Sequence, residues 1–97
     1  MSTLHVLSHS PFGDNRLASC LRVLGEQDAL LLCGDAAYAL QPATLAHDQL
    51  QARALTLFVL AEDAQARGLT VPTWATVIDY PAFVELSVRH DKVNTWL

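Results

Sequence analysis

Charged side chains are scarce in this 97-residue sequence, where they make up 16% of the residues, against roughly 25% in ordinary globular domains. Hydrophobic residues account for 52%. A chain of this length is expected to form one domain, spanning residues 1–97, with one modest core. So few charges indicate either a surface that partners cover or a sheet that is wrapped on both faces.

Basic residues are scarcer still, because the chain has six Lys and Arg for a formal net charge of −4. They are scattered: Arg16, Arg22, Arg53, Arg67, Arg89 and Lys92. Tight binding to a phosphate backbone needs clustered cations. We therefore expect no direct binding of DNA or RNA.

Long apolar runs and a signal peptide are also missing. No run approaches the ~20 residues that span a bilayer, and no basic segment followed by an apolar one opens the chain. We therefore expect no membrane insertion. The sequence has two cysteines. Without a secretion signal, the expected location is the cytoplasm, where both thiols stay reduced.

Recognisable cofactor and metal motifs are absent. The sequence has no glycine-rich nucleotide loop, no His-Glu-x-x-His and no Cys-x-x-Cys. His5 and His9 are four residues apart, but they fall on a strand and the loop after it, so the helical metal-site geometry is missing. We expect no cofactor and no metal ion.

Apolar runs alternate with helical patterns along the chain. Strands are predicted at 4–7, 29–33, 54–60 and 73–80. Helices are predicted at about 14–24, in short pieces within 36–50, from 61 to just before Gly68, and from Pro81 onward. The tail 91–97 is expected to add an edge strand or to cap the sheet. The alternation predicts an α/β fold: one three-layer α/β/α domain with a mostly parallel sheet of four to five strands.

Three acids follow predicted strands, at the end of the sheet where open α/β proteins place their sites. They are Asp35, Asp63 and Asp79. Such residues either form an acidic cluster or cap the helix that follows, and capping is the interpretation we favour.

Cys20 lies on the first predicted helix, where Leu17, Leu21 and Leu24 form the apolar stripe. A helix turns ~100° per residue, so Cys20 falls about 60° to one side of that stripe. This position predicts a partly accessible thiol, with Arg16 as the nearest cation. Cys20 lies beyond the first helical turn, so we expect an ordinary pKa of about 8.5. It is either a weakly activated nucleophile or a small side chain at a packing edge.

Cys33 ends the leucine-rich strand predicted at 29–33 and precedes a glycine. Burial in such a strand raises the pKa of a thiol and leaves it unreactive. We therefore interpret Cys33 as a buried structural thiol.

Four phrases, "LHVLSHSPF", "DALLLCGDAAYA", "LFVLAEDAQARGL" and "IDYPAFVELSVRHDKVNTW", together resemble the TusB/DsrH family over nearly the whole chain. The resemblance implies a DsrE-like fold. It also implies a subunit that joins TusC/DsrF-like and TusD/DsrE-like subunits in a heterohexamer for persulfide transfer. In the Tus branch, the sulfur goes to 2-thiolation of tRNA wobble uridine. In the Dsr branch, it serves the oxidation of stored sulfur.

The same resemblance places the principal sulfur-carrying cysteine on the TusD/DsrE-like subunit. Cys20 falls where DsrH members often hold a cysteine, whereas Cys33 matches no family motif. Our first hypothesis is a structural subunit that supports tRNA thiolation and forms homo-oligomers when isolated. The alternatives are a sulfur-oxidation subunit in which Cys20 carries sulfur, and a stand-alone α/β module that binds a small ligand.

Overall fold

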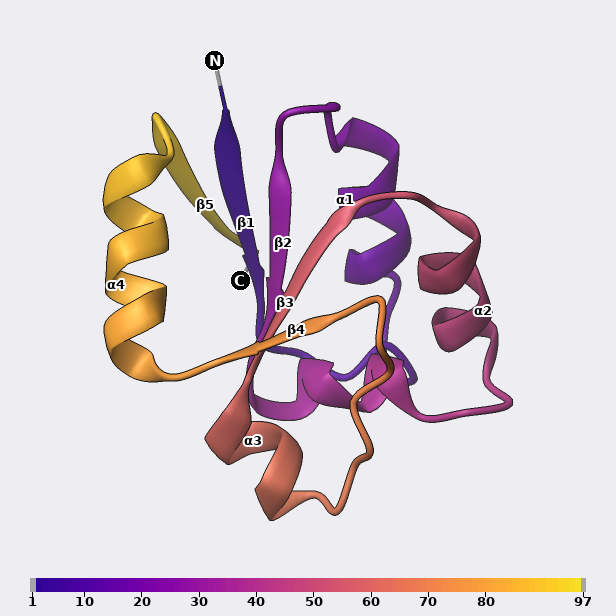
Figure 1. Cartoon of the computed structure of the whole chain (residues 1–97). Helices are drawn as coiled ribbons and strands as arrows, with labels where there is room; N and C mark the ends of the chain where they lie inside the picture. Colours follow the sequence, from indigo (N-terminus) through magenta and orange to yellow (C-terminus); the bar gives the residue numbers. More distant parts are fainter. Residues whose placement is uncertain (1, 97) are drawn as a thin grey trace.

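A computed structural model describes residues 2–96 (Figure 1). The strands are β1 (Thr3–Leu7), β2 (Ala29–Leu32), β3 (Thr56–Leu60), β4 (Thr76–Ile78) and β5 (Lys92–Trp96). The helices are α1 (Arg16–Val23), the 3-10 helix η1 (Gly34–Leu40), α2 (Leu45–Ala52), α3 (Ala61–Ala66) and α4 (Tyr80–Arg89).

All five strands form one parallel sheet in the order β4-β3-β2-β1-β5. The predicted α/β fold is therefore confirmed. Of the two roles expected for the tail, the edge strand is the one observed, since β5 pairs with β1 from Thr3↔Lys92 to Leu7↔Trp96. The chain thus builds the sheet outward from β1 to β4 and then returns to the other side of β1.

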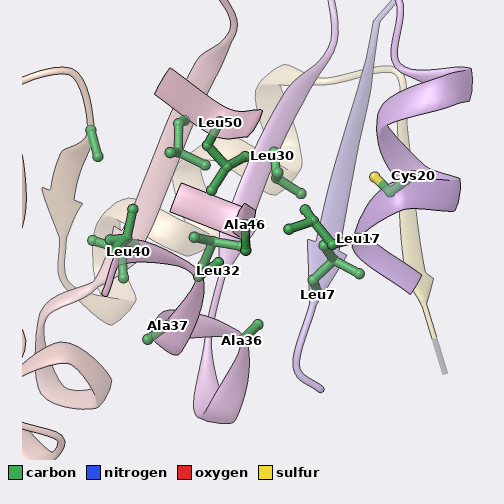
Figure 2. Packing of buried hydrophobic residues seen from close by; sticks show 14 of the residues in the cluster. Leu7, Leu17, Cys20, Leu30, Leu32, Ala36, Ala37, Leu40, Ala46 and Leu50 are labelled. Carbon is green, nitrogen blue, oxygen red and sulfur yellow. The ribbon is translucent and has the colours of Figure 1, made fainter. Parts of the chain in front are cut away.

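One face of the sheet is covered by α1, η1 and α2. In Figure 1, α1 and α2 lie to the right of the strands. Inward side chains of the strands and these helices form the larger hydrophobic cluster, here called the first cluster (Figure 2). Its buried members include Leu7, Leu17, Cys20, Leu21, Leu30, Leu32, Leu40, Leu50 and Val59. Their burial fixes which side of each strand faces these helices.

The opposite face is covered by α4 alone, to the left of the strands in Figure 1. A smaller set of buried residues, the second cluster, lies beneath it: Leu4, Val6, Ala29, Leu31, Leu60 and Ile78. Phe83 and Leu86 of α4 pack against this cluster but stay partly exposed. No residue of α4 is fully buried, so this face has a much thinner cover.

Several boundaries differ from the predicted ones. The strand expected at 73–80 is reduced to Thr76–Ile78 because a turn, closed by the Ala75 N–H donating to the Pro72 carbonyl, precedes it. The helix that begins at Ala61 ends before Gly68, as predicted: it runs to Ala66, Gly68 has a φ of 64°, and the Leu69 N–H donates to the Ala64 carbonyl. This left-handed glycine is the usual helix terminator.

Within residues 2–96, no helix is both long enough and apolar enough to cross a bilayer. The same residues contain no group of three or more His, Cys, Asp or Glu side chains that could hold a metal ion.

Candidate functional site around the two thiols

Cys20 is fully buried, with 0% of its surface exposed. Its side chain projects from α1 toward the sheet, on the same side of the helix as Leu17 (Figure 2). The prediction of a partly accessible thiol is wrong. Leu17, Cys20 and Leu21 together form the buried face of α1, and Leu24, just past the helix end, packs against the same cluster while staying partly exposed.

The predicted ordinary pKa of Cys20 is also wrong. Burial, and next the Asp28 carboxylate, raise the pKa of Cys20 to about 11, against a smaller lowering by Arg53. Arg16, the cation expected beside the thiol, instead pairs with Asp14. Cys20 is therefore held as the neutral thiol at neutral pH.

Cys33 follows β2 directly and is half-buried, which is less burial than predicted. It lies where the extended strand turns into η1, and its Sγ–H donates to the Leu7 carbonyl at 3.4 Å. Its pKa is raised by burial, and next by the Asp63 carboxylate, which agrees with the expected direction. Neither thiol is activated for nucleophilic chemistry in this conformation.

The two thiols lie against opposite faces of the sheet. Cys20 belongs to the first cluster, whereas Cys33 packs against the second. Both are free cysteines. A direct transfer of sulfur from one to the other would have to cross the sheet, so they do not form an internal relay.

The loop after Cys33 is fixed by an acid from the neighbouring strand end. The Gly34 N–H donates to Asp63 Oδ2 at 2.8 Å. Gly34 has a φ of 51°, and a Cβ there would lie 3.2 Å from the Ser8 carbonyl oxygen. Glycine is required because this backbone conformation is strained for other residues and because Ser8 approaches so closely.

Two of the three strand-end acids share one arginine, because Arg67 pairs with Asp35 at 2.8 Å and with Asp63 at 3.7 Å. Asp79 caps α4 by accepting from the Ala82 N–H at 2.9 Å, as predicted. Asp35 instead pairs with Arg67 at 2.8 Å, and Asp63 holds Gly34. Arg67 thus joins Asp35 and Asp63, Asp79 takes no part in that group, and capping holds for one acid of the three.

A buried polar group that sequence reasoning missed joins the first and last strands. His5 Nδ1 accepts from the Trp96 indole N–H at 3.1 Å, and His5 Nε2 lies 3.3 Å from Asp28 Oδ2. Asp28 also accepts the Thr3 and Gly25 N–H groups. The sequence signal was an acid directly before an apolar strand, but its partners are distant along the chain.

A second missed feature is an apolar stripe on the outside of α4. Tyr80, Val84 and Val88 recur every four residues, so they share one side of the helix, and they are 50%, 61% and 79% exposed. Sequence reasoning overlooked this stripe. Val93 of β5, 45% exposed, pairs with Leu4 of the second cluster and therefore faces the same side of the sheet.

The family model of the DsrH like protein matches residues 9–93. The chain belongs to this family. DsrH-like membership confirms the resemblance identified from the four phrases. Protein TusB of Pectobacterium parmentieri is 40% identical over 96 residues, covering 96% of this chain and 99% of that one. Protein TusB of Erwinia tasmaniensis is 36% identical over 95 residues, with the same coverage.

Among solved structures, the ychN protein from E. coli has the same fold. It superimposes with a TM-score of 0.76 over 99% of this chain and all of that one. Only 18% of the aligned residues are identical. The likeness therefore shows the DsrE-like fold of this DsrH-like chain and nothing about its chemistry.

Proposed function

We propose that this DsrH-like protein is a structural subunit of a heterohexameric sulfur-relay complex that supports 2-thiolation of tRNA wobble uridine. Its partners are TusC/DsrF-like and TusD/DsrE-like subunits, and the complex works in the cytoplasm. Family membership and the TusB relatives support the sulfur-relay role. The observation that carries the structural role is the exposed apolar stripe on α4.

We define the α4 surface as Tyr80, Val84, Val88 and Val93. These side chains lie over the face of the sheet that one helix covers. Exposed apolar groups in a row on a charge-poor protein are typical of a protein–protein contact. A partner subunit seated on the α4 surface would complete the second cluster.

The two thiols support a structural role over a catalytic one. The thiolate is the form that accepts sulfur. With a pKa of about 11, Cys20 is thiolate in only on the order of one molecule in ten thousand at pH 7. A TusD/DsrE-like subunit that carries its own reactive cysteine would leave this chain the tasks of assembly and support.

The alternative is a sulfur-oxidation relay in which Cys20 itself carries sulfur. It requires α1 to move away from the sheet, because the Cys20 side chain has no exposed surface. Movement of α1 would expose Leu17 and Leu21 together with the thiol. This cost makes the structural role the better supported of the two.

Assembly of purified subunits tests the proposal. Val88→Asp should prevent this chain from joining TusC-like and TusD-like subunits in size-exclusion chromatography. Val23→Asp is the matched control, since Val23 is 60% exposed on α1, over the opposite face. The proposal fails if Val88→Asp assembles like the unmodified chain, or if the unmodified chain binds neither partner.

A further inference from the structure

A groove separates α1 from α2 on the face opposite the α4 surface. It has a volume of about 520 Å³. Its lining consists of Asn15, Ala18, Leu21, Arg22, Gln49, Ala52 and Arg53. The two alanines leave room between the helices, the side chain of Leu21 adds apolar surface, and the remaining residues carry hydrogen-bonding groups. The groove thus combines an apolar strip with polar walls.

The charge of this groove is opposite in sign to that of the whole protein. Two guanidinium groups line it and no carboxylate does, whereas the formal net charge of the chain is −4. Among residues 2–96, Arg16 and Arg67 form ion pairs with carboxylates, but Arg22 and Arg53 form none. The cationic charge of the groove is therefore left without a counter-charge in its lining.

Arg53 is also held in place. Its Nη1–H donates to the Leu21 carbonyl at 2.5 Å, across the groove from its own helix. This bond satisfies a carbonyl in the last turn of α1 and uses one of the five N–H donors of the guanidinium. Arg22 has a single weak contact, from Nη2 to Ser19 Oγ at 3.3 Å. Both groups retain donors for an incoming carboxylate.

We propose that the groove between α1 and α2 docks an acidic segment of a partner protein. An apolar side chain of the segment would lie against Ala18, Leu21 and Ala52, and its carboxylates would bind Arg22 and Arg53. Guanidinium groups bind carboxylates in paired, charge-assisted hydrogen bonds. Two cations match one or two carboxylates, whereas a nucleic acid needs a longer row of cations and is repelled by the net negative charge. The site lies across the sheet from the α4 surface, so both can be occupied at once.

Amide shifts of the ¹⁵N-labelled full chain, titrated with an end-capped peptide of repeating Glu-Leu-Ala units, test this proposal. The peptide should shift the Ala18 and Ala52 amides first. Arg22→Gln and Arg53→Gln should each weaken binding about threefold, the size of an exposed ion pair. Arg89→Gln, an exposed arginine on α4, is the matched control and should change nothing. Since Arg53→Gln also removes the bond to Leu21, Arg22→Gln alone decides the outcome if the other variant unfolds.

Three results would overturn the proposal. The first is no shift at the groove with millimolar peptide. The second is equal binding of a peptide in which Gln replaces every Glu. The third is a single-stranded oligonucleotide that binds the groove more tightly than the acidic peptide, which would assign it to nucleic acid. Weaker peptide binding by the Arg22→Gln variant, together with normal assembly of the hexamer, would separate this site from the proposed subunit role.

Discussion

The two faces of the sheet are formed by the same strands, but helices cover them to different degrees. The face beneath α1, η1 and α2 has a continuous buried cluster that includes Cys20. The face beneath α4 has a smaller cluster, and its single helix has no fully buried residue and exposes Val84 and Val88. One helix cannot cover a five-stranded sheet as three do. The difference indicates that one face is completed within the chain and the other by a partner.

The comparison predicts that shortening a side chain of the first cluster lowers the free energy of unfolding strongly. Shortening a side chain on the outside of α4 should leave it nearly unchanged. Leu30→Ala removes a fully buried side chain from a central strand and should lower the free energy of unfolding by about 3 kcal/mol. Val84→Ala on the α4 surface should change it by less than about 0.5 kcal/mol. Urea denaturation of the isolated chain measures both, and equal losses would contradict the distinction.

Substitution of Asp28 should have the next largest effect on the free energy of unfolding. Burial works against the ionisation of Asp28, but N–H donation from Gly25 and Thr3, then His5, lowers its pKa below the ordinary 3.8. Asp28→Asn should cost about 2 kcal/mol at pH 7.

The sign of the pH dependence follows from that lowered pKa. The stabilisation is present above the pKa of the unfolded state and is lost as the pH falls through the lower pKa of the folded state. Below about pH 4, the free energy of unfolding of the wild type should therefore fall more steeply than that of Asp28→Asn. Parallel acid curves would show that the carboxylate contributes nothing as an anion.

Replacing each cysteine by serine changes one atom, the sulfur, and compares the two sides of the sheet. Cys20→Ser buries a hydroxyl among apolar side chains and should cost about 1 to 2 kcal/mol. Cys33→Ser should cost less, because its hydroxyl can replace the thiol as donor to the Leu7 carbonyl. Thermal unfolding of the two variants shows which substitution lowers stability more. Alkylation of the native protein should be slow at both sites and slower at Cys20, and rapid labelling of Cys20 would show that α1 opens readily.

The smallest loss of stability is expected from a substitution in β5, at its contact with β1. Trp96→Phe keeps most of the ring and removes the indole N–H that His5 accepts, at a cost of about 1 kcal/mol. Trp74→Phe is the control, because Trp74 touches His47 edge-on without a hydrogen bond. Denaturant midpoints that fall equally in both variants would mean that the His5 bond adds nothing.

Local pattern was enough to predict the strands, their parallel arrangement and the capping role of Asp79. Apolar runs and helix-start residues act over a few neighbours, so a sequence reveals them directly. The accessibility of Cys20 was mispredicted because the apolar stripe alone does not show how wide a strip of α1 the sheet covers: Leu17, Cys20 and Leu21 are all buried.

Contacts between distant segments were beyond sequence reasoning. The partners of Asp28 come from three separate places, Thr3, His5 and Gly25, and nothing in the local pattern of any one of them indicates the others. The α4 surface was missed for a related reason. Both sides of that helix carry apolar residues, and only the tertiary fold shows which side faces the sheet.

Sulfur transfer by the reconstituted hexamer tests the central claim most directly. A chain with both Cys20→Ala and Cys33→Ser, assembled with its TusC-like and TusD-like partners, should pass sulfur to the downstream acceptor at close to the normal rate. Removing the sulfur-carrying cysteine of the TusD-like subunit is the positive control and should abolish transfer. If the double variant assembles normally and transfers no sulfur, one of these thiols is catalytic and the structural role is wrong.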